Sequence, residues 1–294
     1  MPKKAIPDRS AISIVGPGNL GTALALTLSQ TGYSVKAIVV RPGSKSTRRA
    51  KALAKHVGAK FVEAGKQPLT GDILWITVPD DAIAGVARAL AQAGRWKRKI
   101  VVHSSGALTS DELAPLRDKG ARVASVHPMM TFVRGAVPQM AGVAFALEGD
   151  PAAVRAARSI VTALGGKPFV IQKQNKVLYH VFGAFASPLV IALMATMEQV
   201  ALAAGIRKRD IRPVMTPLLE QTLHNYLEND AAAAFSGPLV RGDVATVRKH
   251  LAELSPLPEA REVYVALART ALKQLPLRNR DEIAEELRRS SLSK

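Results

Sequence analysis

The chain has 294 residues and a mass of 31.3 kDa, enough for two domains with sizeable cores, and its 48% hydrophobic and 22% charged residues exclude wholesale disorder. It contains no cysteine, which excludes disulfides, thiolate metal sites, iron–sulfur clusters and a cysteine nucleophile. The net charge of +18 invites a nucleic-acid interpretation, but the basic clusters are scattered and only 4% of residues are aromatic, so we favour small anionic ligands.

The first half of the chain has the pattern of an α/β domain. Residues 1–10 are basic, but no apolar stretch with a cleavage site follows them, so we expect a cytoplasmic protein. Short β-branched apolar runs then alternate with helical stretches, which is typical of a parallel sheet covered on both faces. We predict a Rossmann domain with a doubly wound, mainly parallel sheet over residues 1–172. Its predicted strands are 11–15, 34–40, 72–78, 99–102 and 123–126, with 143–147 and 168–171 as possible extensions.

The first predicted strand runs into a glycine-rich turn that opens a helix, Gly16-Pro-Gly-Asn-Leu-Gly21. In this strand–turn–helix context the pattern G-x-G-x-x-G indicates a dinucleotide site, although a loop that merely needs glycine is the alternative. Gly16 permits the tight turn, Gly18 lets the backbone approach a pyrophosphate, and Gly21 lets helix and strand pack closely. The helix N-terminus offers N–H groups to the phosphates. The predicted cofactor-binding residues here are Gly16, Gly18, Asn19, Leu20 and Gly21.

The end of the second predicted strand indicates which dinucleotide binds. NAD-binding proteins usually carry an acidic residue there, roughly twenty residues past the glycines, to hold the ribose hydroxyls. Residues 39–49 contain no carboxylate, and Arg41 can stack on adenine and meet a 2′-phosphate. A solvated basic loop is the alternative interpretation. We therefore predict NADP(H) as the cofactor, held by Arg41, Ser44, Lys45 and Arg48.

Three later strands end in residues that can face the same crevice, because the carboxyl ends of parallel strands meet at one edge of the sheet. We predict cofactor contacts from Val78, Pro79, Ser104 and Ser105. Asp80 is ambiguous, since it can face the crevice or cap the following helix. A histidine at a strand end is a candidate general base or substrate hydrogen-bond donor, although an isolated histidine is more often structural. His127 is the stronger candidate and His103 the weaker.

From residue 173 the β pattern disappears, and we predict a helical domain over 173–294. Its first helix can carry Lys176, Tyr179 and His180 on one face. Residues 177–197 contain no Asp, Glu, Lys or Arg and are long enough to span a bilayer. A helix apolar all round is also expected in a helical core or a dimer interface, so we expect no membrane segment. Pro188 should kink this helix.

Several segments together resemble one family, the Rossmann-like proteins with a C-terminal domain of unknown function 2520 (DUF2520). The resemblance covers nearly the whole chain, and the segments are 16–21, 103–107, 126–132, 178–180, 185–187 and 236–243. The family is similar to pyrroline-5-carboxylate reductase, ketopantoate reductase and the β-hydroxyacid dehydrogenases. This implies a 6-phosphogluconate dehydrogenase-like C-terminal domain, a homodimer formed through it, and a reductase or dehydrogenase activity. Pro188 departs from the family, in which Asn commonly stands at this place.

The resemblance also implies roles for particular residues. Prephenate dehydrogenases carry a His-Pro-Met segment similar to that of His127, and β-hydroxyacid dehydrogenases use a lysine placed like Lys176. We therefore expect Lys176, His127 or His180 to move the proton, and no metal. The predicted function is hydride transfer between NADP(H) and a small anionic keto/hydroxy or imino/amino substrate, in a cleft between the domains. A non-catalytic NADP-binding sensor or scaffold is the alternative, and a basic Rossmann protein associated with nucleic acid is the third.

Overall fold

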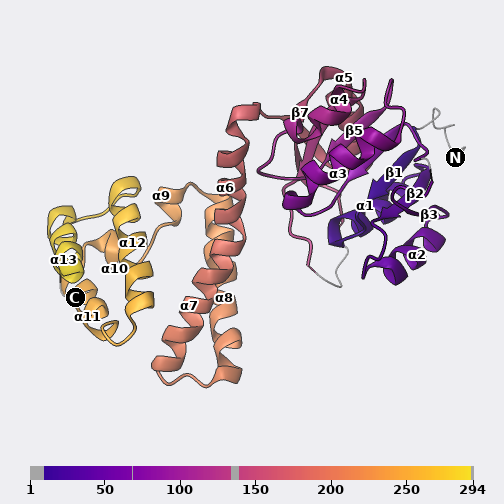
Figure 1. The fold of residues 1–294 in the computed structure, drawn as a ribbon. Helices are drawn as coiled ribbons and strands as arrows, with labels where there is room; N and C mark the ends of the chain where they lie inside the picture. The colour runs from indigo at the N-terminus through magenta and orange to yellow at the C-terminus, as the bar shows by residue number, and fades with distance from the viewer. Residues whose placement is uncertain (1–9, 68, 134–138, 293–294) are drawn as a thin grey trace, which may run out of the picture. The chain divides into compact units, whose positions relative to one another are not determined.

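The structure is a computed structural model that describes residues 10–67, 69–133 and 139–292 (Figure 1). The chain forms two compact units, Met1–Ala184 and Phe185–Lys294. The division falls within the first long helix after the sheet, whereas we predicted a domain boundary between residues 172 and 173. The first turns of that helix are grouped with the sheet because their side chains contact strand ends, as described below.

The first unit is built on an eight-stranded sheet with the order β3-β2-β1-β4-β5-β6-β7-β8. All neighbouring strands are parallel except β6 and β7, which are antiparallel. The predicted doubly wound, mainly parallel sheet is therefore confirmed, including both of its possible extensions. The strands are β1 Ile12–Val15, β2 Val35–Val40, β3 Lys60–Glu63, β4 Ile73–Ile76, β5 Ile100–His103, β6 Arg122–Pro128, β7 Ala144–Gly149 and β8 Lys167–Val170.

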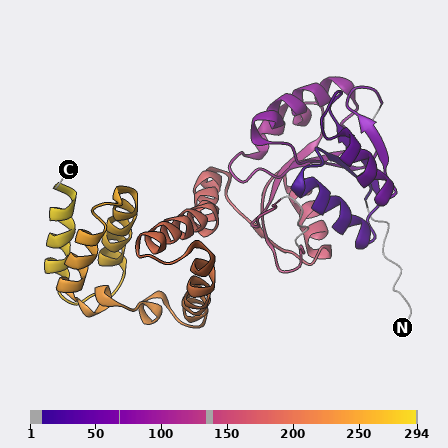
Figure 2. The same cartoon turned by 90° about the horizontal axis from the view of Figure 1, so that it is seen from below.

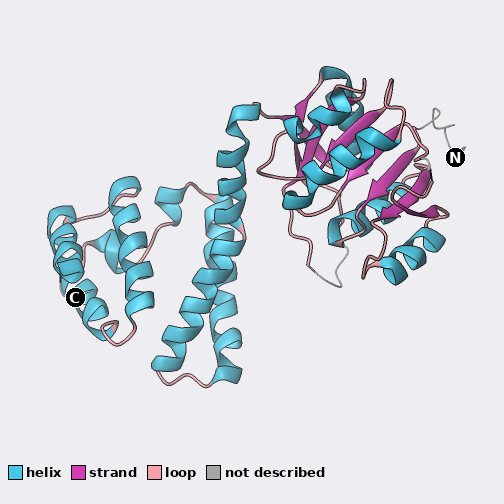
Figure 3. Cartoon of the chain, in the orientation of Figure 1, coloured by secondary structure: helices cyan, strands magenta, loops and turns pink. Residues whose placement is uncertain are grey.

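Helices cover both faces of this sheet (Figures 2 and 3). One face packs against α1, α2 and α5, and the other against α3, the 3₁₀ turn η1 and α4. Successive residues of β4 alternate between the two cores, with Trp75 on the first face and Ile76 on the second, as the pleat of a strand requires. The helices of this part are α1 Asn19–Gln30, α2 Thr47–His56, α3 Asp80–Ala93, η1 Ser110–Leu113, α4 Ala114–Arg117, α5 Pro151–Ala163, η2 Lys173–Asn175 and α6 Lys176–Ala186.

The strand order creates a switch point between β1 and β4. From β1 the chain winds in one direction through β2 and β3, and then returns to continue through β4 and β5. In open α/β sheets, ligands bind outside the carboxyl ends of the strands at this point, because the crossing connections diverge and leave a crevice. The fold thus places the glycine turn after β1 and the segment after β4 side by side.

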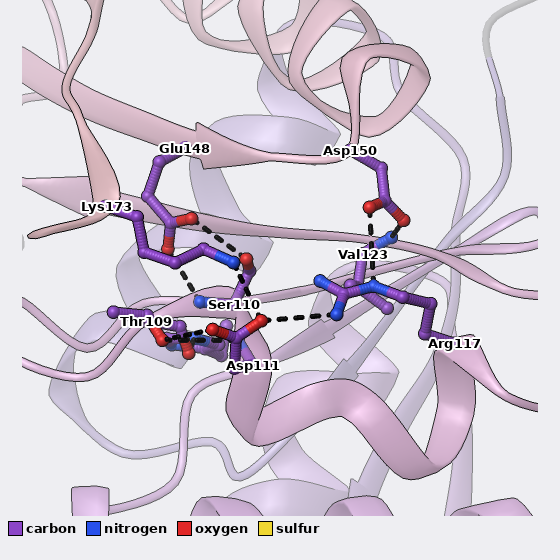
Figure 4. A network of polar contacts seen from close by, with 9 residues as sticks. Thr109, Ser110, Asp111, Arg117, Val123, Glu148, Asp150 and Lys173 are labelled. Atoms are coloured by element: carbon purple, nitrogen blue, oxygen red, sulfur yellow. Dashed lines mark hydrogen bonds and ion pairs between the residues drawn. The ribbon is translucent and has the colours of Figure 1, made fainter.

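A network of charged residues links η2, which precedes α6, to the rest of the first unit (Figure 4). The Asp111 carboxylate accepts hydrogen bonds from Lys173 at 2.7 Å and from Arg117 at 3.2 Å. The Arg117 guanidinium lies 3.3 Å from Asp150, which accepts a hydrogen bond from the backbone N–H of Val123 at 2.9 Å. These contacts fix where α6 begins relative to β6.

The second unit is helical, so every described element after β8 is a helix, as predicted. Ser187 has a non-helical backbone (φ −135°, ψ −82°) and Pro188 is the first residue of α7, so the expected kink is a complete break between α6 and α7. A small core joins α11, α12 and α13 through Val247, Val265 and Ile283. The helices are α7 Pro188–Ala203, α8 Lys208–Glu228, α9 Ala231–Ala234, α10 Pro238–Arg241, α11 Val244–Glu253, α12 Pro258–Gln274 and α13 Arg280–Leu292.

The segment Lys173–Ala203 is long and apolar enough to cross a membrane by length and composition, and its most apolar 18-residue stretch has a mean hydropathy of 1.9. None of its most apolar stretch is buried within the described residues. On α6, Leu178 and Phe182 are 72% and 62% exposed, and on α7 Ile191 is 63% exposed. The absence of a membrane segment remains a prediction, and this apolar surface needs a physical explanation.

Candidate functional site

The glycine turn after β1 is held in a tight conformation. Gly16 adopts a φ of +90°, and its carbonyl oxygen accepts hydrogen bonds from the N–H of Gly18 at 2.8 Å and from the Thr77 hydroxyl at 2.7 Å. A Cβ atom at Gly21 would lie 2.5 Å from that carbonyl oxygen and 2.5 Å from the Thr77 hydroxyl. Only glycine therefore fits at position 21, and the turn brings α1 against the ends of β1 and β4.

The start of α1 has the features of a phosphate site. A Cβ atom at Gly18 would meet no atom within 4 Å, so the space above the turn is open. Gly18 is the N-cap residue and no side chain caps the helix, so the first N–H groups of α1 have no intrahelical acceptor. The Asn19 side chain instead donates to the carbonyl oxygen of Phe132 at 2.9 Å. Asn19 and Leu20 can therefore offer a pyrophosphate their backbone N–H groups.

The basic segment after β2 lies beside this turn. The N–H of Gly16 donates to the carbonyl oxygen of Val39 at 3.0 Å, which joins the two strand ends. A turn closed by the Ser44 N–H and the Arg41 carbonyl oxygen then leads into α2. The side chains of Arg41, Lys45 and Arg48 are exposed. This donor set suits the 2′-phosphate of NADP, because it combines guanidinium and ammonium groups with no carboxylate in residues 39–49.

At the end of β4, Val78 packs against the glycine turn, since a Cβ atom at Gly16 would lie 2.6 Å from its side chain. Pro79 is exposed and is the N-cap residue of α3, which has no side-chain cap. The Asp80 carboxylate does not cap this helix. It accepts a hydrogen bond from the Ser105 hydroxyl at 2.7 Å and so connects the end of β4 to the loop after β5.

His103, at the end of β5, is a structural residue. It is fully buried, its Nδ1 accepts a hydrogen bond from the Ser105 N–H at 3.1 Å, and its Nε2 lies 2.9 Å from the Thr109 carbonyl oxygen. The Ser105 N–H needs an acceptor at Nδ1, and the Thr109 carbonyl oxygen needs a donor at Nε2. The proton of His103 is therefore on Nε2. Burial lowers the pKa of His103 to about 4, so the imidazole is neutral near neutral pH.

The two serines after His103 use their hydroxyls within the protein. The Ser104 hydroxyl accepts a hydrogen bond from the Trp75 indole at 2.7 Å. The Ser105 hydroxyl donates to Asp80 and accepts from the Leu108 N–H at 2.9 Å. Both residues are nearly buried. They shape the loop at this edge of the sheet, and their direct contact with a cofactor remains a prediction.

Lys176, the first residue of α6, reaches the loop after β5 and the middle of β6. Its Nζ donates to the carbonyl oxygen of Ser105 at 2.8 Å and to the hydroxyl of Ser125 at 2.5 Å. The residue is only 1% exposed. The predicted proton-transfer lysine is thus at the expected edge of the sheet, but it is enclosed and its ammonium has protein partners.

His127, at the end of β6, lies beside two residues of α6. The Tyr179 hydroxyl is 2.8 Å from Nδ1 of His127, with the two rings perpendicular at 5.5 Å. The ring of His180 lies 6.2 Å from that of His127, and His180 is exposed. The structure therefore brings all three predicted proton-transfer residues to one place, within the first unit. Their catalytic roles remain predictions.

The charges at this place are set mainly by burial. Burial lowers the pKa of Lys176 to about 8, although Glu148 and Asp80 act in the opposite direction. Burial and the nearby Lys176 lower the pKa of His127 to about 4. Burial raises the pKa of Tyr179 to about 12. Near neutral pH, His127 and Tyr179 are neutral and the lysine is their cationic neighbour.

Sequence reasoning assigned no role to Tyr179 or Ser125. Both had a signal in the sequence, because Tyr179 shares the predicted helix face of Lys176, and Ser125 shares a strand face with His127. What the sequence lacked was the pairing, since Tyr179 and His127 are 52 residues apart.

Comparisons with known proteins agree with this fold. Residues 3–128 match the model of a Rossmann-like domain, and residues 143–271 match that of the domain of unknown function DUF2520. No curated protein matches the chain.

Solved structures resemble the chain over most of its length. A Bacteroides fragilis protein provisionally named an NADP oxidoreductase is 20% identical, with a TM-score of 0.73 over 89% of this chain and 97% of its own. An imine reductase from Myxococcus stipitatus in complex with NADP+ is 18% identical (TM-score 0.62; 90% and 94% covered). A pyrroline-5-carboxylate reductase from Coxiella burnetii is 15% identical (TM-score 0.58; 97% and 98% covered). At these identities the likeness establishes the fold.

Proposed function

This chain belongs to the Rossmann-like proteins that carry a DUF2520 domain, and we propose that it is an NADP(H)-dependent oxidoreductase. One observation carries the proposal. The uncapped, glycine-lined start of α1 lies at the switch point of the sheet, directly beside a basic segment without a carboxylate. A helix N-terminus suits a pyrophosphate, and a cluster of arginine and lysine suits a 2′-phosphate. The names of the imine reductase and NADP oxidoreductase structures support this cofactor class.

The cofactor would be held by groups that the fold already positions. Backbone N–H groups of Asn19 and Leu20 would bind the pyrophosphate, and Val78 and Pro79 would border the crevice. When bound, the nicotinamide would supply or accept the hydride. The residues proposed to hold the 2′-phosphate are Arg41, Ser44, Lys45 and Arg48.

We propose that the substrate is a small anionic keto/hydroxy or imino/amino compound. The net charge of +18 attracts anions, and Lys176 places a positive charge behind the ends of β5 and β6. His127 and His180 offer ring nitrogens beside it. Together these groups suit the orientation of a polar carbonyl or imine next to a carboxylate.

A fluorescence titration with NADPH and NADH tests the cofactor. We expect NADPH to bind the wild-type chain at least about tenfold more tightly than NADH, and this preference to be lost in Arg41→Ala. Arg88→Ala is the matched control, because Arg88 is an exposed arginine on α3 and its removal changes the net charge equally. Absence of binding to either nucleotide would overturn the proposal. Equal loss in both variants would show that net charge, not a 2′-phosphate site, sets the preference.

A non-catalytic NADP-binding sensor or scaffold is the second candidate, and one observation favours it. Lys176 is buried, and its ammonium donates hydrogen bonds to the Ser105 carbonyl oxygen and the Ser125 hydroxyl, as expected of a structural lysine. A screen for NADPH oxidation with keto and imino acids as substrates distinguishes the two functions. Turnover that is abolished by His127→Ala, with NADPH affinity retained, supports the enzyme. Tight NADPH binding without turnover across the screen supports the sensor.

We also propose that a second copy of the chain covers the apolar surface of α6. Lys176 and Tyr179 fix the start of this helix to strand ends, and the break at Ser187 ends it. These contacts hold α6 against a folded α/β domain, which disfavours its insertion into a bilayer. The homodimer that the family resemblance implies would bury Leu178 and Phe182.

A further inference from the structure

Tyr179 and His127 form a pair whose geometry defines where a proton sits. The Tyr179 hydroxyl lies 2.8 Å from Nδ1 of His127, and the rings are nearly perpendicular at 87°. The ring of Phe169 packs against Tyr179 at a centroid distance of 6.0 Å. The tyrosine is therefore held between an aromatic ring and the imidazole. Among the described residues, His127 is the hydrogen-bond partner found for its hydroxyl.

The groups that face His127 disfavour its protonation. Lys176 and His180 approach it from α6, and His103 approaches it from β5. Lys176 is a cation, and burial keeps His103 neutral by lowering its pKa to about 4. Within the part of the chain that the structure describes, no carboxylate pairs with His127, so a second positive charge there would lie beside the first without compensation. A neutral imidazole carries a single N–H, so the choice between its two nitrogens matters.

We infer that Tyr179 is a positioning residue that donates its hydroxyl proton to Nδ1 of His127, and so fixes the imidazole as the neutral tautomer with its proton on Nε2. A phenol is a good donor to a neutral imidazole nitrogen, and this orientation satisfies both groups at once. In the opposite orientation Nδ1 would donate to Tyr179, and the phenol proton would need another acceptor in a half-buried place next to Phe169.

The backbone of Gly106 lies close to Nε2 of His127. A Cβ atom at Gly106 would lie 2.9 Å from Nε2 of His127 and 2.5 Å from Cδ2 of His180, so a side chain there would collide with both rings. Glycine at position 106 therefore lets the loop after β5 pack against the Nε2 edge of the His127 ring. The use of this tautomer rests on the proposed function: in an oxidoreductase, His127 would offer the substrate a hydrogen-bond donor in a fixed position. The ligand group selected there is an acceptor such as a carbonyl or carboxylate oxygen.

Nitrogen NMR of the full chain labelled with ¹⁵N-histidine tests the inference without cofactor or substrate. His127→Gln identifies the His127 signals. In the wild-type protein we expect Nε2 to be protonated and Nδ1 unprotonated, with no titration between about pH 5.5 and 8.5. In Tyr179→Phe we expect the two tautomers to mix, and the proton affinity of His127 to rise at least about tenfold.

The chain contains a matched control. His250 and Tyr264 form a similar pair on α11 and α12, with Nδ1 and the hydroxyl 3.2 Å apart and rings at 89°. Tyr264→Phe should leave the His127 signals unchanged. A proton on Nδ1 of wild-type His127, titration of His127 near its ordinary pH, or an unchanged tautomer in Tyr179→Phe would each overturn the inference. If Tyr179→Phe does not fold, the wild-type tautomer and titration decide.

This experiment and the NADPH titration fail independently. A chain that binds no NADPH can still show His127 protonated on Nε2, which would remove the proposed function and leave the pair intact. A chain that binds NADPH but carries the proton on Nδ1 would keep the cofactor and lose this role of Tyr179.

Discussion

Lys176 on α6 donates to the hydroxyl of Ser125 on β6 at 2.5 Å, although the two residues are 51 positions apart in the chain. The same ammonium bonds the Ser105 carbonyl oxygen at the end of β5, and the residue is almost completely buried. The lysine thus joins α6 to the middle of β6 and to the loop after β5. Its charge also contributes to keeping His127 neutral.

The burial of Lys176 predicts a pH dependence of stability. Its pKa is lowered from 10.5 to about 8, so the unfolded chain binds more protons than the folded chain between these values, and stability rises with pH across the window. We expect the urea midpoint to rise from about pH 7.5 to 9.5, with at most about 3 kcal/mol gained by full deprotonation. The series ends at about pH 9.5 because tyrosine side chains ordinarily ionise near pH 10.

Lys176→Met isolates this effect, because methionine fills a similar space without a charge. We expect the variant to lose most of the rise in the same pH range. A chain of net charge +18 loses repulsion between its positive charges as the pH rises, and this stabilises the wild type and the variant alike. The difference between the two stability curves therefore measures the contribution of Lys176. Parallel curves would show that Lys176 keeps an ordinary pKa in the folded chain.

The sequence predicted the parts of the fold that local patterns encode. Apolar runs separated by helices indicated the sheet, and the residues from Gly16 to Gly21 indicated its ligand edge. β3 was missed because Lys60-Phe-Val-Glu63 is short and only Val62 is buried, so it lacks the continuous apolar run of a central strand. An edge strand carries a weaker signal than its neighbours.

The candidate site was predicted only in part, because its contacts join distant segments. The sequence placed Lys176 and Tyr179 on one helix face, but it did not indicate that Lys176 would be enclosed. Strand periodicity likewise did not indicate that the Trp75 indole would donate a hydrogen bond to the Ser104 hydroxyl, since Trp75 lies on β4 and Ser104 follows β5. Such pairings follow from strand order and register, which a single sequence does not specify.

Two glycine substitutions separate folding from cofactor binding. At Gly18 a Cβ atom would enter open space, so we expect Gly18→Ala to fold normally but to bind NADPH at least about tenfold less tightly, because the methyl group would occupy the pyrophosphate's place. At Gly21 it would collide with the Gly16 carbonyl oxygen, so Gly21→Ala should lower the thermal midpoint.

Thermal denaturation and NADPH titration of the two variants provide the measurement. Undiminished NADPH binding by a folded Gly18→Ala protein would mean that the pyrophosphate does not lie over this turn. An unchanged thermal midpoint in Gly21→Ala would mean that the contact between α1 and the glycine turn is looser than described.

Carboxylates near η1 should differ in their effect on stability according to burial (Figure 4). Glu148 is 4% exposed and accepts hydrogen bonds from the backbone N–H of Ser110 at 2.6 Å and from its hydroxyl at 2.9 Å. Glu148→Ala leaves these buried donors without an acceptor, so we expect a loss of about 2–4 kcal/mol in the free energy of unfolding. Asp111 pairs with Lys173 and Arg117 near the surface, and Asp111→Ala should cost less than about 1 kcal/mol.

Urea denaturation at two salt concentrations checks this ranking. The Asp111 effect should shrink at high salt, because ions screen exposed pairs, whereas the Glu148 effect should persist. A larger loss from Asp111→Ala than from Glu148→Ala would contradict the assignment of Glu148 as the buried anchor of η1.

The apolar surface of α6 leads to a prediction about assembly. If a second copy covers Leu178 and Phe182, each side chain contributes about 1.5–3 kcal/mol by leaving water, and arginine at both positions should prevent association. We expect light scattering after size exclusion to give twice the chain mass of 31.3 kDa for the wild type, and the single-chain mass for the variant carrying both L178R and F182R. Leu267→Arg is the control, because Leu267 is likewise an exposed leucine (50%) but lies on α12, outside α6. Sedimentation of the wild type with phospholipid vesicles would favour a bilayer as the cover, and a wild-type monomer at micromolar concentration would contradict the homodimer.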